Sequence, residues 1–402
     1  MRRVVITGVG PVSSIGIGSD AFANALREGR SGVSPITGFD TTGFPYVMGG
    51  EVHDFDPRQY VTRLKIEEWG RVSLFAAAAA RLAVVDAGVD EAELSAANAG
   101  SCMGTTAGES GVLERVTEES LTVGFGGVAP GLVRQVSGAR LSMAVNRELE
   151  LSGDAVTLSN ACSASNYALG YGYDLIRSGE LDYAVVGGAD SVMRWSHAGF
   201  YRLGALAERA CSPFDKDRSG IITAEGGAGL FLETRESAVA RGARIYAEVL
   251  GYGLNCDASH MVAPDRGSVG ECMRIAHRNA GIQPSDVDYI CAHGTGTETN
   301  DITEAGAVGD VFGANPPPVS SIKSMLGHTM GAASGHGAIA AALAITHSFL
   351  PPTINFAAPD PRMTPVDPVP NTARQATVGV AQVNGFAFGG NNAIVILGRP
   401  DS

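Results

Sequence analysis

The strongest constraint on the fold is an alternation of strand-like and helix-like segments that runs through the chain and starts afresh after Arg241. A first strand is predicted over residues 3–8, where glycines end it, and further apolar runs predict strands over 99–104, 155–158 and 183–187. An alanine-rich stretch predicts a helix over 72–87. Apolar runs of this kind are typical of parallel strands that helices bury on both faces, so we expect an α/β protein.

The second part of the chain repeats this order of elements. Strands are predicted over 245–250, 289–292, 378–385 and 393–398, and helices over 269–280 and 331–349. No linker or charge run interrupts the 402 residues, and 45% of them are hydrophobic, so the two parts should share one large body. We expect two similar halves that cover residues 1–243 and 244–402.

The composition argues against several classes of protein. The net charge is −13 and the basic residues are scattered, so the clustered basic face that nucleic acid requires is not expected. No apolar stretch approaches the length of a membrane span, and the run after Arg3 is too short for a signal peptide. The six cysteines show no C-x-x-C spacing and should be reduced thiols. We expect a cytoplasmic protein without membrane contact.

The sequence contains partial matches to cofactor-binding and metal-binding motifs, but none of these motifs is complete. Gly8 and Gly10 follow the first strand, but Ser13 stands where a dinucleotide fingerprint has its third glycine. The segment 215–226 imitates a calcium loop, yet its twelfth position is Gly226 and not the required glutamate. No histidine or cysteine group has zinc spacing. We therefore predict no metal and no cofactor.

Cys162 lies where a predicted strand gives way to a predicted helix, within the sequence LSNACSASN (158–166). The N–H groups and dipole of a helix N-terminus favour a thiolate, and the small neighbours leave room for a bulky acyl group at the sulfur. This pattern predicts a nucleophile. Taken alone, the position is explained equally well by a buried cysteine that packs as a small apolar side chain.

Two histidines also stand at the ends of predicted strands. His293 follows the strand at 289–292 and opens the loop AHGTGTETND, at the sheet edge where parallel α/β proteins place their sites. His328 ends the sequence SIKSMLGH (321–328), which also contains Lys323, one of three lysines in the chain. A lone histidine is more often structural, but the glycine and threonine residues after His293 favour a functional loop.

A fourth segment is the glycine-rich loop 386–392. Its glycines would let backbone N–H groups approach a developing oxyanion, and Phe388 could block or open the approach.

These four segments, in this order, resemble the elongating β-ketoacyl-[acyl carrier protein] synthases of fatty-acid and type II polyketide pathways. The resemblance runs from about residue 3 to 398 and includes the sequence SPFDKDRSG (212–220). It implies the thiolase fold, in which two related βαβαβαββ halves form a five-layered αβαβα body. It also implies that the N-terminal half carries the nucleophile and a dimer interface, and the C-terminal half both histidines.

The resemblance implies a decarboxylative Claisen condensation. Cys162 would carry the acyl group as a thioester, while backbone N–H groups of Cys162 and Phe388 stabilise the tetrahedral oxyanion. His293 and His328 would hydrogen-bond the thioester carbonyl of malonyl-ACP as carbon dioxide departs. The acyl carrier protein is therefore the expected partner.

The resemblance also implies supporting residues. Lys323 would support the histidines, paired with the carboxylate of Glu304, and Thr295 and Thr297 would bind the pantetheine arm. The cluster of Arg63, Lys65 and Arg71 could meet an acidic carrier, although a solvated helix face explains it as well.

One stretch departs from the family pattern. Elongating synthases usually carry a glutamate shortly after the second histidine, whereas the sequence GAASGHG (331–337) contains no acid. This favours a specialised type II polyketide ketosynthase, which would act as a homodimer or as a heterodimer with a chain-length-factor subunit. Housekeeping fatty-acid elongation and a non-enzymatic role as a chain-length-factor-like subunit are the alternatives.

Overall fold

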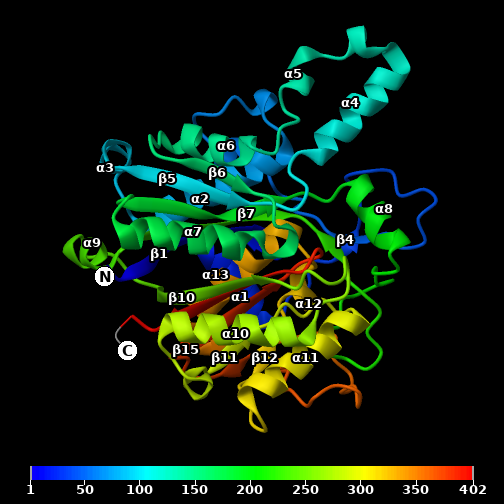
Figure 1. The fold of residues 1–402 in the computed structure, drawn as a ribbon. Helices are drawn as coiled ribbons and strands as arrows, with labels where there is room; N and C mark the ends of the chain where they lie inside the picture. The colour runs from blue at the N-terminus through cyan, green and yellow to red at the C-terminus, as the bar shows by residue number, and fades with distance from the viewer. Residues whose placement is uncertain (1, 401–402) are drawn as a thin grey trace.

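The computed structural model describes residues 2–400 (Figure 1). The strands of the first half are β1 (Val4–Ser13), β5 (Ala99–Gly104), β6 (Ala155–Leu158), β7 (Tyr183–Asp190) and β9 (Gly226–Thr234). The strands of the second half are β10 (Ala247–Cys256), β11 (Tyr289–Cys291), β12 (Val319–Ser320), β15 (Val380–Phe386) and β16 (Asn391–Gly398).

Both halves arrange their strands in the same order. The first half reads β6-β5-β7-β9-β1 across the sheet, and the second reads β12-β11-β15-β16-β10. In each, the three strands at the outer end are parallel and the other two pair antiparallel. The halves join where β1 pairs with β10 over three residues. The predicted repetition of one α/β unit is therefore confirmed.

Helices separate and cover the two halves. The larger ones are α1 (Ser19–Glu28), α2 (Arg71–Ala87), α4 (Ser110–Val123), α6 (Arg140–Leu149), α7 (Ala164–Ser178), α8 (Arg194–Arg202), α10 (Arg266–Ala280), α11 (Glu298–Phe312) and α13 (Ala333–His347). The shorter ones are α3 (Glu91–Ala96), α5 (Pro130–Val133), α9 (Arg235–Ala240) and α12 (Lys323–Leu326). Two 3₁₀ turns precede the central helices: η4 (Ala161–Ser163) before α7 and η6 (Met330–Ala332) before α13. Small strands include β8 (Thr223–Ala224).

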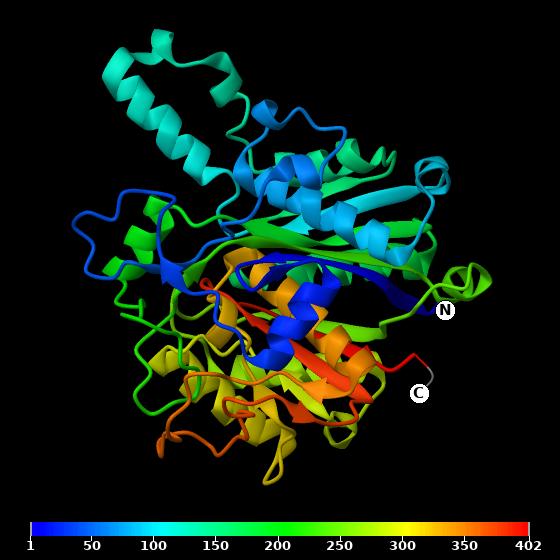
Figure 2. The same cartoon turned by 180° about the vertical axis from the view of Figure 1, so that it is seen from behind.

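The helices and sheets form five layers. The helices α7 and α13 lie between the two halves, α2 and α6 cover the outer face of the first, and α10 and α11 cover that of the second (Figures 1 and 2). Every residue of α13 up to Ile345 is buried, as expected for a central layer. This is the αβαβα body that the resemblance implies. The predicted boundary at residues 243 and 244 falls between α9 and β10 and stays a prediction.

The first strand is longer than predicted. Gly8 and Gly10 do not end it, because β1 continues to Ser13. A Cβ atom at Gly8 would lie 2.0 Å from the carbonyl oxygen of Ala83, and one at Gly10 would lie 2.0 Å from that of Ala79. These glycines thus allow the alanine-rich helix α2 to pack directly on the strand.

A segment that contains the helices α4 and α5 projects from the body (Figures 1 and 2). It carries exposed apolar side chains, among them Leu121 at 83% and Phe125 at 81% exposure. None of the helices described between residues 2 and 400 is long and apolar enough to cross a bilayer.

Candidate active site

Cys162 lies in the turn that connects β6 to α7. The preceding residue, Ala161, has φ of 50°, a left-handed conformation that is uncommon outside glycine and that redirects the chain into η4. The Cys162 side chain is 5% exposed and lines a cavity of about 430 Å³. The predicted nucleophile is therefore at the start of a central helix and faces an accessible space.

The predicted preference of Cys162 for the thiolate is not supported. Burial raises the pKa of the Cys162 thiol to about 12, although the charge of Lys323 opposes this shift. The backbone N–H groups of Cys162 and Phe388 also act to lower the pKa, but burial has the largest effect. Burial therefore favours the thiol in the resting site.

His293 and His328 line the same cavity as Cys162. His293 follows β11, and His328 follows α12 in the next strand connection of the second half. Their ring centroids are 5.6 Å apart and the rings are nearly perpendicular, with an interplanar angle of 81°. The structure thus brings the three predicted catalytic side chains together from both halves.

Both imidazoles are neutral at ordinary pH. Burial lowers the pKa of His293 and of His328 well below the usual value, and the positive charge of Lys323 lowers both further. The pKa of Lys323 is itself lowered, chiefly by burial. Neutral imidazoles can each donate one hydrogen bond without being charged.

The His328 ring has a defined tautomer. Its Nδ1 accepts a hydrogen bond from the Met330 N–H at 3.1 Å, so the ring proton lies on Nε2. The backbone of His328 is held by residues 222–224: His328 N donates to the Ile222 oxygen, and Ala224 N donates to the His328 oxygen. His328 is therefore a fixed donor.

Lys323 and Glu304 do not form the direct pair that was expected. Lys323 Nζ donates to the backbone oxygen of His293 at 2.5 Å. The Glu304 carboxylate accepts from the backbone N–H groups of His293 (2.8 Å) and Gly294 (2.7 Å), and from Asn384 Nδ2 (2.9 Å). The two charges instead hold His293 from opposite sides of its backbone. Local sequence could not predict this, because the three segments meet only in the folded protein.

The predicted pantetheine-binding threonines line the cavity as well. Thr295 Oγ1 and Thr297 Oγ1 are hydrogen-bonded to each other at 2.8 Å. Each hydroxyl keeps capacity for one further partner.

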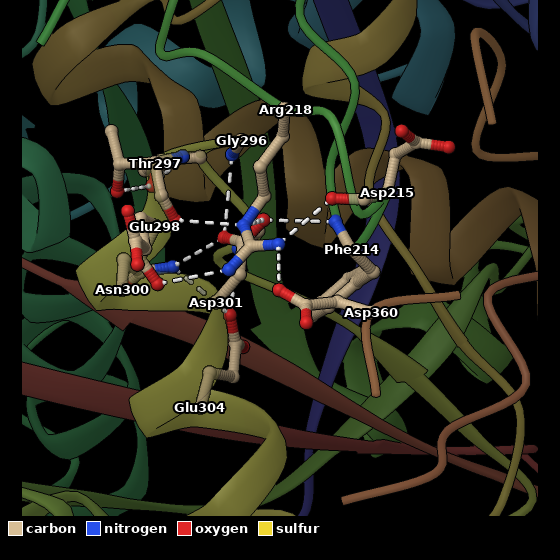
Figure 3. A network of polar contacts seen from close by, with 12 residues as sticks. Phe214, Asp215, Arg218, Gly296, Thr297, Glu298, Asn300, Asp301, Glu304 and Asp360 are labelled. Carbon is tan, nitrogen blue, oxygen red and sulfur yellow. Dashed lines mark hydrogen bonds and ion pairs between the residues drawn. The ribbon is translucent and has the colours of Figure 1, made fainter. Parts of the chain in front are cut away.

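A buried ionic network holds the loop that carries these threonines. Figure 3 shows the Arg218 guanidinium between Asp360, at 2.7 Å, and the carbonyl oxygens of Thr297 and Glu298. Asp301 accepts from the N–H groups of Phe214 and Gly296, so it holds the backbone of this region. Arg218 also lines the cavity, a position that its family-typical segment did not predict.

Phe388 stands at the cavity with 36% of its surface exposed. Its ring lies 5.7 Å from that of Phe200, which sequence analysis did not single out. The following Gly389 and Gly390 have φ of 86° and 81°, conformations that favour glycine. The loop can therefore turn sharply enough to bring the Phe388 N–H to Cys162.

The stretch without an acid packs tightly in the core. His336 is fully buried, with Nδ1 3.0 Å from Thr329 Oγ1 and Nε2 3.3 Å from the Val12 oxygen. A Cβ atom at Gly337 would lie 3.2 Å from Val383 Cγ1. Gly337 thus allows α13 to pack directly on β15.

The basic cluster is neutralised by carboxylates. The ion pairs join Arg63 to Glu91 and Glu150, Lys65 to Glu68, and Arg71 to Glu225. The structure therefore favours a solvated, paired surface over an uncompensated basic patch. Within residues 2–400, no group of three or more histidine, cysteine, aspartate or glutamate side chains has the geometry of a metal site.

The chain matches known proteins over almost its whole length. Residues 1–238 match the family described as "Beta-ketoacyl synthase, N-terminal domain", and residues 246–357 match "Beta-ketoacyl synthase, C-terminal domain". It is 38% identical to "3-oxoacyl-[acyl-carrier-protein] synthase 2" of Synechocystis sp. over 97% of this chain and 96% of the relative. It is 37% identical to "Nodulation protein E" of Rhizobium sp. strain N33, with 98% of each chain covered.

Solved structures of ketosynthases superpose closely on this chain. "The ishigamide ketosynthase/chain length factor" superposes with a TM-score of 0.97 at 50% identity, and 99% of both chains is covered. A structure titled "AntDE:AntF (apo): type II PKS acyl-carrier protein in complex with its ketosynthase bound to the hexaketide" superposes with a TM-score of 0.88 at 31% identity, again over 99% of both chains. The chain therefore belongs to the β-ketoacyl synthase family of thiolase-fold condensing enzymes, which are acyltransferases.

Proposed function

We propose that this chain is the catalytic ketosynthase of a type II polyketide pathway. It would condense an acyl group held on Cys162 with malonyl-ACP to give a β-ketoacyl-ACP. The observation that carries the proposal is the single cavity lined by Cys162, His293 and His328, with Lys323 buried behind His293. The 31% identity to a structure titled as a type II PKS ketosynthase supports the polyketide assignment, and the 50% identity to the ishigamide ketosynthase/chain length factor supports a partner subunit.

In the loading step, Cys162 Sγ attacks the thioester carbonyl of acyl-ACP. The oxyanion of the tetrahedral intermediate accepts hydrogen bonds from the backbone N–H groups of Cys162 and Phe388. The carbonyl re-forms as the carrier thiolate leaves, and the proton lost by Cys162 ends on that thiolate. The raised pKa of Cys162 requires this proton to move during attack, and the neutral His293 ring can relay it.

In the condensation step, His293 and His328 donate to the thioester carbonyl of malonyl-ACP. The bond to the carboxylate breaks, carbon dioxide leaves, and the electron pair forms an enolate whose oxygen the two donors stabilise. The enolate carbon then attacks the acyl-Cys162 carbonyl. Collapse of this intermediate releases the Cys162 thiolate, which takes up a proton, together with the β-ketoacyl-ACP.

The remaining predicted residues serve this reaction indirectly. Lys323 and Glu304 hold the His293 backbone, and burial together with the Lys323 charge keeps both imidazoles neutral. Thr295 and Thr297 would bind the pantetheine arm, and Phe388 would control entry to Cys162. In this scheme the half at 1–243 supplies the nucleophile, and the half at 244–402 supplies both histidines.

A second subunit is part of the proposal. The strand β6 is the outer strand of its sheet and pairs only with β5 among the described residues. Near the same end of the first half lie the exposed apolar side chains Leu113, Leu121, Val123 and Phe125. An uncovered strand edge and exposed apolar groups are typical of a surface that another chain covers, here a second copy or a chain-length-factor subunit.

A fatty-acid elongation synthase is the second candidate. The Synechocystis relative, which is 38% identical, is named a 3-oxoacyl-[acyl-carrier-protein] synthase. A chain-length-factor-like role without catalysis is opposed by Cys162 in the cavity. Intact-mass analysis separates these possibilities. The chain would be mixed with acyl-ACPs of graded length, alone and with a candidate partner subunit, and Cys162→Ala would be the control. Loading on Cys162 supports a ketosynthase, and products extended more than once through β-keto groups support the polyketide pathway. A folded chain that loads no acyl group would overturn the proposal.

A further inference from the structure

Asp190 is a buried carboxylate that the proposed reaction does not use. It is the last residue of β7 and is 1% exposed. It accepts four hydrogen bonds, from Thr105 Oγ1 (2.8 Å) and from the N–H groups of Thr106 (2.7 Å), Ala107 (3.0 Å) and Gly331 (2.7 Å). Asp190 thus ties the loop after β5 to the turn η6, which follows His328.

The backbone of Gly331 is held on both sides of its Cα atom. The N–H of the preceding peptide donates to Asp190 Oδ2, and the carbonyl oxygen of the following peptide accepts from Ser165 Oγ, on α7, at 2.5 Å. A Cβ atom at position 331 would lie 2.5 Å from Thr105 Cα and 2.7 Å from Asp190 Oδ2. Both peptides around Gly331 are therefore fixed by partners.

The first of these peptides constrains the residue before Gly331. Met330 has φ of 51°, a left-handed conformation that a residue with a side chain keeps only where its surroundings impose it. In this conformation the Met330 N–H reaches His328 Nδ1 at 3.1 Å. That hydrogen bond is what leaves the ring proton of His328 on Nε2.

We propose that Asp190 is a positioning residue for His328. By holding the Gly331 N–H, it keeps Met330 in the left-handed conformation, and the Met330 N–H in turn keeps His328 in the tautomer that donates from Nε2. The His328 backbone is fixed separately by residues 222–224, so Asp190 acts on the ring and not on the backbone. The inference rests on the proposed function, in which His328 donates to the substrate carbonyl.

The state of Asp190 fits this role. Burial raises the pKa of Asp190 to about 6, while its hydrogen bonds lower it, so the group is a carboxylate at neutral pH. Oδ2 serves Thr106 and Gly331, and Oδ1 serves Thr105 and Ala107. An amide has no negative charge and offers one oxygen in place of two, so Asp190→Asn should weaken the hold on the Gly331 N–H with little change in volume.

The decisive measurement is the tautomer of His328 in the full-length protein. Histidine-selective ¹⁵N labelling reports which ring nitrogen carries the proton, and the His328 signal is identified by its loss in His328→Gln. The parent protein should show a protonated Nε2 and an accepting Nδ1. In Asp190→Asn, the His328 signals should move toward an average of both tautomers.

Catalysis gives a second readout. Decarboxylation of a malonyl-pantetheine thioester would be followed in a Cys162→Ala background, with and without Asp190→Asn. The expected kcat is lower by about 10- to 100-fold, in the range of other residues that orient an active-site group, with KM changed less than threefold. A merely structural defect would reduce the folded fraction, and not kcat per folded molecule.

Two further variants serve as a control and as a replacement for Asp190→Asn. Glu233→Gln alters another fully buried carboxylate, which contacts Thr7, Ser237 and Arg241 far from the cavity, and should leave the His328 signals and kcat unchanged. Gly331→Ala would disturb the same hydrogen bond on the Gly331 side, because the added methyl group would meet Asp190. It should have the same effect on His328 as Asp190→Asn, and it replaces Asp190→Asn if Asp190→Asn does not fold. Unchanged His328 signals in either folded variant overturn the inference. A parent protein that neither loads nor decarboxylates would refute the proposed function, and the tautomer measurement would still decide the role of Asp190.

Discussion

The two halves of the molecule enter their central helices through turns of the same build, but the turns serve different purposes. The turn η4 leads into α7, η6 leads into α13, and both helices are 15 residues long. Each turn begins with a left-handed residue, Ala161 with φ of 50° and Met330 with φ of 51°. The second residue is Cys162 in one turn and Gly331 in the other.

The difference lies in what each second residue presents. Cys162 points a side chain into the cavity, where a reacting atom is needed. Gly331 has no space for a side chain, and the peptides on either side of it are instead bonded to Asp190 and Ser165. A duplicated structural unit can thus supply a nucleophile in one copy and a rigid support for His328 in the other.

The largest effect should come from removing the nucleophile. In Cys162→Ala, acyl loading should fall by about a thousandfold or more, since no sulfur remains to form the thioester. Malonyl decarboxylation should persist, because it depends on the second turn. Intact mass and carbon dioxide release measure the two activities. Loading on a different cysteine, or loss of both activities in a folded protein, would contradict this division.

Removal of the His328 ring tests the role of the second turn, η6, which supports this histidine. His328→Ala should lower decarboxylation by about 100- to 1000-fold, because one of two donors to the enolate oxygen is lost. Loading of Cys162 should fall less than tenfold, as measured by the initial rate of acyl transfer. An equal loss of both activities would mean that the two turns do not have separate roles.

Lys323 influences the pH range in which His293 and His328 are neutral. Its charge lowers the pKa of both imidazoles, so in Lys323→Met these pKa values should rise. Protonation of His328 would place a proton on Nδ1 against the Met330 N–H. The acid limb of the decarboxylation profile should therefore shift to higher pH, with a loss of about tenfold at neutral pH. An unshifted limb would show that Lys323 acts through the His293 carbonyl alone.

The smallest effect concerns the left-handed residues. Ala161→Gly relieves the strain of a side chain in this conformation but adds freedom to the unfolded chain, and the two terms nearly cancel. The free energy of unfolding should change by less than about 1 kcal/mol, as measured by denaturant titration. The matching change at Met330 is not comparable, because the buried Met330 side chain packs with Leu206 and Ile221 and its removal would leave a cavity. A loss of several kcal/mol in Ala161→Gly would show that contacts of the Ala161 side chain, and not its backbone conformation, decide the stability of the turn.

Much of the architecture was predictable from local sequence. The strands β5 and β6 match the predicted ranges 99–104 and 155–158, because apolar runs of this length are sufficient signals. The continuation of β1 through Gly8 and Gly10 was not predictable in this way. It depends on the approach of α2, which only the folded chain contains.

The same division applies to the site. The positions of Cys162, His293 and His328 followed from motifs at strand ends. The high pKa of Cys162 did not, because burial outweighs the local helix terminus that the motif suggested. Asp190 had one available signal, a charged residue at the end of a buried apolar strand. Its partners at positions 105–107 and 331 are distant in sequence and could not be identified.

Burial of Lys323 also has a practical consequence for chemical labelling. The chain has three lysines, and the other two, Lys65 and Lys216, are exposed. Amine-reactive cross-linkers would therefore find two lysine side chains on the surface. A carrier protein captured at one of them would be located within the length of one linker, and its approach to the cavity could be mapped with few competing products.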